Sequence, residues 1–544
     1  MIKKLFSFLL SLAFLSSLGS GLSIAENLPD ASAVFSDSSV KTVGSGLEVS
    51  GTDIKITSPG TYILSGECSD GSVTVKKGTS GVTIILSGLT LTSKESAPIC
   101  INKGASVTLT AEKGTVNTLS DTKKNNSDNY PDNENAENAV IKCKDGSNVT
   151  VNGTGKIVIL ANGKNGIKSG SSTDEDGDAS LTLSEASLTI TAPVNDAINA
   201  ESDLYIKSGT LEISAKDDAV HSDRLLSVGE KDTDGPRVTI SSCYEGLEGA
   251  DIKILSGNIR IHSEDDGINA ANSDLSGYAF SLEISGGNIS VDAEKGDGID
   301  SNGTLTISGG NVTVFSTSSG ANSPLDSDGM FKITGGTVLA VGNSSMAQNP
   351  VSGSQNFVSF GSGKTAGGQG NIPRGGGKND SPGFKPSDDA PFGSPRQNKN
   401  AAPPERPEPS GGEGSENMGT PENTGVPGNM NAPGKNENLT ISAGDTLSLT
   451  LDGETLFSVT AKRSANYVFY SSPALSKDKT YSFNINGEKK EELKVSESFS
   501  GGSFSPGGKE PESFPQQGSA AGNKSDVTGI SILEILRRFF SFMI

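Results

Sequence analysis

Apolar residues alternate with polar ones along many short segments of this chain. Residues 202–215, 250–263 and 303–316 each place Leu, Ile or Val at every second position, with Ser-Gly or Gly-Gly between two such runs. A period of two predicts strands with one buried face, and the glycine-containing dipeptides predict the turns that join them. We therefore expect repeated strand–turn–strand units without intervening helices.

A short, mostly acidic turn recurs beside these strand pairs. In chain order the turns read ENAV (137–140), KNGI (164–167), NDAI (195–198), DDAV (217–220), YEGL (244–247), DDGI (265–268) and GDGI (296–299). Their spacing averages about 26 residues, a period typical of solenoids, whose repeats bury their apolar faces only by stacking. We predict an all-β fold, a right-handed parallel β-helix of about eleven coils with a small C-terminal β module and disordered linkers.

Segments outside the repeats have a different composition. Two lysines, an apolar run and small residues before Glu26 predict a secretory signal peptide and an extracellular location. The predicted organisation is a signal peptide (1–25), a β-helix domain (40–350), a disordered Gly/Pro/Asn-rich linker (361–436), a C-terminal β module (437–490), a disordered tail (498–528) and an apolar C-terminal segment (529–544). Apolar residues recur at helical spacing in that last segment, but it is too short to cross a bilayer, so we expect no transmembrane span. Two roles remain open for it: a helix on the surface of a membrane or partner, and a cap on the end of the solenoid.

Charge and cysteine content narrow the functional classes. The formal net charge is −21, which excludes nucleic acid as a partner because polyphosphate recognition begins with a basic face. Cys68, Cys100, Cys143 and Cys243 are far apart and lack the spacing of a zinc site. We expect them to fill the narrow core, although disulfides remain open outside the cell. Nothing in the sequence indicates the oligomeric state.

The acidic turns carry the candidate chemistry. Equivalent residues of successive coils lie above one another, so stacking forms a column of carboxylates about 4.8 Å apart, namely Asp196, Asp218, Glu245, Asp266 and Asp297. Each neighbouring pair would repel by about 3.5 kcal/mol at an effective dielectric constant near 20. The column is therefore either solvated at an exposed corner or occupied by cations. Calcium suits carboxylate and carbonyl oxygens, whereas zinc and copper prefer His or Cys, and the chain has only two histidines, His221 and His262.

The sequences GTVNTLSD (114–121), DDAVHSD, YEGLEGADIKILSGNI, DDGINAAN and GDGIDSNGTLTISGGNVTV together resemble a secreted bacterial family of calcium-binding, carbohydrate-binding β-helix proteins. The resemblance implies a fold like that of pectate lyases, bound Ca²⁺, and an acidic plant-type polysaccharide such as polygalacturonate or pectin as partner, with cellulose as a further candidate. The aspartates that it carries over are Asp196, Asp217, Asp218, Asp223, Asp265, Asp266, Asp297 and Asp300. With Asn195 and Glu245 from the turns, these make up the predicted metal ligands. Lys164 and Asn165 replace an acidic pair, so no metal is expected at that coil.

Three functional classes remain open at this point. A binding module would use calcium to bridge its acidic column to carboxylates of an anionic glycan. A polysaccharide lyase would add a base that abstracts the proton beside a uronate carboxylate, for which Lys216 and Lys295 are weak candidates next to acidic turns. Each lysine is better explained as a charge partner of its acidic neighbours. A surface adhesin or scaffold is the third class.

Overall fold

The computed structural model describes residues 28–132, 136–275, 277–351, 354–361, 439–477 and 479–495. Strands β1–β37 make up the regular secondary structure of these residues, and no helix occurs among them. A 33-stranded, mostly parallel sheet and a four-stranded antiparallel sheet contain all of these strands. The prediction of an all-β fold is confirmed, while the closed, right-handed solenoid stays a prediction.

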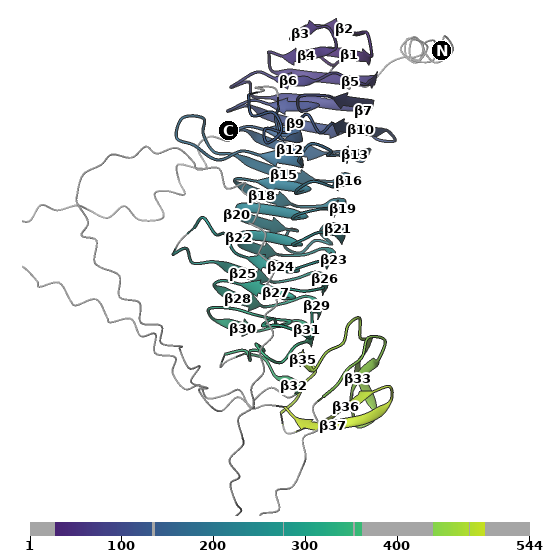
Figure 1. The fold of residues 1–544 in the computed structure, drawn as a ribbon, viewed down its shortest axis with the longest axis vertical. Helices are drawn as coiled ribbons and strands as arrows, with labels where there is room; N and C mark the ends of the chain where they lie inside the picture. Colours follow the sequence, from purple (N-terminus) through teal and green to yellow (C-terminus); the bar gives the residue numbers. More distant parts are fainter. Residues whose placement is uncertain are drawn as a thin grey trace, which may run out of the picture. The chain divides into compact units, whose positions relative to one another are not determined.

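The parallel strands are arranged in three stacks, in which each strand pairs with its equivalent one repeat later (Figure 1). The first stack contains β4 (Asp53–Ile56), β6 (Val73–Val75), β8 (Ile99–Ile101), β11 (Ala139–Cys143), β14 (Asn165–Ser169), β17 (Ile198–Ala200), β20 (Val220–Val228), β22 (Leu247–Ile254), β24 (Ile268–Ala270) and β27 (Ile299–Ser301).

The second stack contains β5 (Gly60–Cys68), β7 (Val82–Ser93), β9 (Ser106–Ala111), β12 (Asn148–Asn152), β15 (Ser180–Ser184), β18 (Asp203–Ile206), the later parts of β20 and β22, β25 (Ser281–Ile284), β28 (Thr304–Ile307) and β30 (Phe331–Ile333). The third stack contains the end of β7, β10 (Val116–Asp121), β13 (Lys156–Leu160), β16 (Ala186–Ala192), β19 (Gly209–Ala215), β21 (Arg237–Ser242), β23 (Asn258–Ser263), β26 (Asn288–Ala293), β29 (Asn311–Phe315) and β31 (Thr337–Gly342). A repeat contributes one segment to each stack, and the acidic turn leads into the first.

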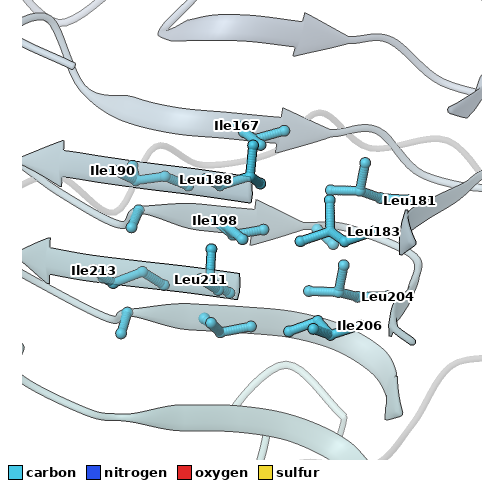
Figure 2. Packing of buried hydrophobic residues seen from close by; sticks show 14 of the residues in the cluster. Ile167, Leu181, Leu183, Leu188, Ile190, Ile198, Leu204, Ile206, Leu211 and Ile213 are labelled. Carbon is cyan, nitrogen blue, oxygen red and sulfur yellow. The ribbon is translucent and has the colours of Figure 1, made fainter. Parts of the chain in front are cut away.

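The core consists of aliphatic side chains stacked on their own equivalents (Figure 2). Ile167 lies in register with Ile198, and the same holds for Leu188 with Leu211 and for Ile190 with Ile213; the side chains of all six are buried. The alternation read from the sequence thus sends one face of every strand into a continuous apolar interior. Burying such a side chain contributes about 1.5–3 kcal/mol, so the core stabilises the stacks strand by strand.

Antiparallel strands close both ends of the stacks. At the N-terminal end, β1 (Ala31–Ser36) pairs with β2 (Ser39–Gly44), and β3 (Leu47–Ser50) pairs with β4. At the other end, β35 (Tyr467–Ser471) pairs with both β31 and β32 (Phe357–Gly361). Because an open parallel edge invites pairing with another chain, these strands protect the sheet from aggregation.

The four-stranded sheet consists of β33 (Thr446–Leu451), β34 (Glu454–Thr460), β36 (Thr480–Ile485) and β37 (Glu488–Lys494). It overlaps the region 437–490, where the sequence analysis placed a C-terminal β module, and β37 extends four residues beyond that boundary. The buried residues of this sheet share a core with Phe315, Val358 and Phe360. Arg463, which lies between β34 and β35, donates from its Nε to Asp292 Oδ1 at 2.7 Å. Segments separated by more than a hundred residues are therefore packed together here.

Several sequence predictions fall outside the described residues: the signal peptide (1–25), nearly all of the linker (361–436), the tail (498–528) and the apolar end (529–544). No helix in the described part of the chain is long and apolar enough to cross a membrane. The four cysteines are all buried with free thiols, and burial raises the pKa of Cys143 to about 12. Cys68, Cys143 and Cys243 belong to the apolar core, as expected, whereas the Cys100 thiol donates to Glu137 Oε1 at 3.8 Å.

In the acidic turns, a glycine or alanine follows Asp196, Asp218, Glu245, Asp266 and Asp297 because the next coil passes close by. At Gly298 an added Cβ would meet the Val314 Cγ1 and approach the Pro324 carbonyl oxygen at 2.7 Å, whereas the equivalent Ala219 is accommodated. We expect Gly298→Ala to lower the free energy of unfolding by about 1–3 kcal/mol, measured by thermal and denaturant unfolding. The exposed control Asn302→Ala should change it by less than about 0.5 kcal/mol. Equal stabilities of the two variants would contradict the close approach.

Candidate functional site

The acidic residues of the turns form a column held in place by backbone hydrogen bonds. The backbone amide of the residue that follows each acidic residue donates a hydrogen bond to the backbone carbonyl of the equivalent acidic residue in the next coil. Ala197 donates to Asp218 in this way at 3.0 Å, and Gly267 donates to Asp297 at 3.0 Å. We call this the turn column; its members are Asn165, Asp196, Asp218, Glu245, Asp266, Asp297 and Ser323. The sequence analysis identified its acidic members correctly.

A second polar column runs beside the first, on the strands of the first stack. Except for Lys142, its members lie three residues after those of the turn column, and strand register places each on its equivalent. This strand column contains Lys142, Lys168, Asn199, His221, Glu248, Asn269 and Asp300. Of these, the sequence analysis had proposed only Asp300 as a ligand. The signal that it missed was a polar residue at the third position after each acidic turn residue.

Burial raises the pKa of several carboxyl groups in the two columns. It raises the pKa of Asp196 and Asp300 to about 6, and that of Glu245, Asp266 and Asp297 to about 7. Desolvation is the largest cause in each case, and repulsion by neighbouring carboxylates adds to it. These carboxyl groups are therefore desolvated, and a nearby positive charge would favour their ionised forms.

Hydrogen bonds orient the carboxylates without neutralising them. Asp196 accepts from the Asn199 Nδ2 at 2.7 Å and from the Asp218 amide at 3.2 Å. Asp266 accepts from the Asp297 amide at 2.6 Å, and Asp297 in turn accepts from the Ser323 amide. A backbone amide of each coil therefore donates a hydrogen bond to the carboxylate of the preceding coil. These hydrogen bonds fix the positions of the carboxylate oxygens at low conformational cost.

One group of carboxylates combines both columns at Asp266, Asp297 and Asp300. Each contributes an oxygen, and these atoms all lie within 4.8 Å of one another. Beside them, Asn269 Oδ1 is one of two buried polar side-chain atoms of the described residues with no hydrogen-bond partner. Its Nδ2 donates to Glu245 Oε2 at 3.0 Å, and since the two ends of an amide diverge, Oδ1 points away from Glu245. An unsatisfied buried oxygen costs about 1–3 kcal/mol, and it is the kind of atom that a calcium ion takes as a ligand.

Two further groups come from the same columns. Asp196, Asp217 and Asp218 offer oxygens within 4.8 Å of one another, and so do the ligand atoms of Asp218, His221 and Glu248. Burial, and then repulsion by Glu248, raises the pKa of Asp218 strongly. His221 is the only side chain in these groups that supplies a positive charge.

Other predicted ligands have protein partners of their own. The Asn195 Nδ2 donates to Asn165 Oδ1 at 2.7 Å, and Asp223 Oδ1 lies 2.8 Å from the His221 Nε2. Asp265 accepts a hydrogen bond from Tyr244, which raises the pKa of that phenol to about 12. Within the described residues, none of these three belongs to the all-carboxylate group around Asp297.

The two lysines proposed as bases lie outside the columns. The Lys295 Nζ donates to Glu264 Oε1 at 2.6 Å, and this bond raises the pKa of Lys295, which opposes a role as a base. The side chain of Lys216 is exposed. By contrast, burial and then repulsion from Lys168 lower the pKa of Lys142, a lysine that the sequence analysis did not select.

Comparisons with known proteins identify the family of this chain. The profile of a family described as carbohydrate-binding domain-containing protein matches residues 50–229 and 232–369. A protein of that description from Acetivibrio thermocellus is 32% identical over 216 residues, which cover 34% of this chain and 71% of the relative. A solved structure titled as a polysaccharide lyase-like protein from C. thermocellum, a gadolinium derivative, is 24% identical, covers 56% of this chain and 97% of its own, and has a TM-score of 0.33. Because the family profile spans more than half of the sequence, the chain belongs to the family of carbohydrate-binding domain-containing proteins.

Proposed function

We propose that this protein is a secreted, calcium-dependent carbohydrate-binding protein that recognises an acidic polysaccharide. Family membership supports the carbohydrate-binding role. The three stacks of parallel strands support a right-handed parallel β-helix as the scaffold, in which equivalent residues repeat at one-coil intervals. The observation that carries the calcium dependence is the pair of buried columns, where carboxylates face one another beside an unpartnered amide oxygen.

Calcium is the cation that fits this donor set. Asp266, Asp297 and Asp300 supply carboxylate oxygens, and Asn269 supplies the amide oxygen. Hard oxygen donors in a flexible arrangement are typical of calcium sites, while softer metals would need His or Cys. The group of Asp196, Asp217 and Asp218 is a second calcium site in this proposal. Calcium bound there would offer coordination positions to glycan carboxylates and would offset the repulsion within the columns.

An acidic glycan fits the charge along the strand column. A protein of net charge −21 repels a polyanion unless local positive charge overcomes the repulsion. The strand column supplies such charge beyond its acidic part, where Lys142 and Lys168 lie in register. Lys168 pairs with Glu201 at 3.0 Å, whereas none of the ion pairs of the described residues includes Lys142. A uronate carboxylate would give Lys142 a direct ion pair in addition to the longer-range attraction of Glu201 and Glu137.

A direct binding assay tests this function and separates its alternatives. We expect polygalacturonate to retain the full chain in the presence of calcium and to release it when chelator is added. We also expect Lys142→Gln to weaken this retention at least several-fold, whereas the exposed control Lys113→Gln should not weaken it. Equal retention with and without calcium would contradict calcium dependence. Retention by cellulose instead would redirect the substrate class, and release of unsaturated uronides, detected by their ultraviolet absorbance, would identify the chain as a lyase.

Removing one proposed ligand should separate calcium affinity from folding. Asp297→Asn keeps the shape of the side chain but removes a buried charge, so in chelator the variant should be at least as stable as the wild type. Calcium at a hundredfold excess over its Kd stabilises a native state by about 2.7 kcal/mol, and this increment should shrink in the variant. Thermal unfolding with and without calcium measures both quantities. The exposed control Asp234→Asn should keep the full increment, and an undiminished increment in Asp297→Asn would contradict the site.

The raised pKa values predict an unusual pH dependence for the metal-free protein. The unfolded-state pKa values of Asp and Glu are 3.8 and 4.5, while Glu245, Asp266 and Asp297 have folded-state values of about 7. Between these values the folded state binds more protons, so in chelator the free energy of unfolding should fall as pH rises from about 4 to about 7. Melting temperatures across this range measure the slope. The stabilisation by calcium should grow over the same range because calcium needs ionised ligands. A melting temperature that rises with pH in chelator would contradict the prediction.

A further inference from the structure

His221 lies in the strand column among three carboxylates. Its Nε2 is 2.8 Å from Asp223 Oδ1, and its Nδ1 makes a short contact with Glu248 Oε2. The Asp218 Oδ2 lies 3.7 Å from the same Nδ1. The imidazole belongs to β20, the carboxylates come from the same coil and the next, and the side chain is only 18% exposed.

The contacts of both ring nitrogens determine the charge of this imidazole. A neutral imidazole has one N–H donor, and its other nitrogen can only accept. An ionised carboxylate can also only accept, so a neutral ring would leave one nitrogen facing a carboxylate lone pair to lone pair. When both carboxylates are ionised, Nδ1 has to donate to Glu248 and Nε2 to Asp223, which makes the ring an imidazolium.

Register reveals what this imidazolium replaces. Asp218, His221, Glu245 and Glu248 occupy the same four column positions as Asp266, Asn269, Asp297 and Asp300, two coils further along. The later set has three carboxylates and the unpartnered oxygen of Asn269, the donor set proposed above for calcium. The earlier set has three carboxylates and a positive ring where Asn269 would be. The two sets differ chiefly in whether the protein supplies the cation itself.

We propose that the His221 side chain is a built-in cation that takes the place of calcium between its own coil and the next, where it occupies the position that Asn269 has in the later set. The inference rests on the proposed function, because it concerns which of the repeated sets bind calcium. It makes His221 the residue that sets the number of calcium ions, and it predicts that the gap between the coils of Asp218 and Glu245 stays closed to the metal. A ring with both nitrogens donating has no lone pair for a transition metal, so zinc is excluded from this position as well.

The decisive variant is His221→Asn, which copies the residue found at Asn199 and Asn269. We expect the full chain of this variant to bind one more calcium ion than the wild type, counted by equilibrium dialysis with elemental analysis and by titration calorimetry. The matched control is His262→Asn, which alters the chain's other histidine, a 44% exposed ring beside Asp292 and Glu294, and should leave the count unchanged. A folded His221→Asn protein with no additional calcium would overturn the proposal.

A measurement on the wild type covers the case in which the variant does not fold. In the ¹⁵N NMR spectrum of calcium-saturated protein, His221 should show both ring nitrogens protonated, and added zinc should not change them. A single protonated nitrogen, or a zinc-induced shift, would overturn the proposal. Failure of the proposed function is distinguishable, because then the wild type and the His262→Asn control would bind no calcium at all, whereas failure of this inference alone leaves wild-type binding intact.

Discussion

In-register parallel pairing is the constraint on which the rest of this structure depends. Each strand donates and accepts hydrogen bonds with its equivalent in the next repeat, so every side chain lies beside the side chain at the same position one coil later. For Ile167 and Ile198 this repetition is favourable, because aliphatic groups of similar shape pack closely. For Asp266 and Asp297 it is unfavourable, because like charges are brought together out of water.

The two polar columns show how the chain handles this conflict along a single face. One coil has Asn165 in the turn column and Lys168 in the strand column. There Lys168 pairs with Glu201, and the turn has no acidic pair. Further along, an imidazole lies among Asp218, Asp223 and Glu248. Beyond it, the carboxylates face one another without a protein cation, and this is where the proposal places calcium. In the proposal, the positive charge comes from lysine at the coils of Lys142 and Lys168, from the imidazole at the coil of His221, and from calcium at the carboxylate groups that contain Asp196 and Asp297.

The closing elements matter because the same pairing that builds the stacks would otherwise continue into another molecule. The antiparallel strand β35 covers the edge of β31 with residues far away in sequence, and the Arg463–Asp292 ion pair connects that segment to β26. The stacks therefore have a defined end, and binding to a long polymer has to use the outward faces of the coils rather than their edges.

The sequence by itself determined the all-β class, the repeat and the acidic turn column, because strand alternation and turn composition are local properties that recur at every coil. It also located the acidic turns in which Asp266 and Asp297 occur. The tertiary structure decided which polar residues meet. Asn269 and Glu248 join the columns only through strand register, while Asp223, Asn195 and Asp265 have protein partners that their positions in the turns did not reveal. The physical reason is that repeats of unequal length stack by hydrogen bonding rather than by sequence spacing, so the environment of His221 is set by carboxylates from two coils and is not encoded in either one alone.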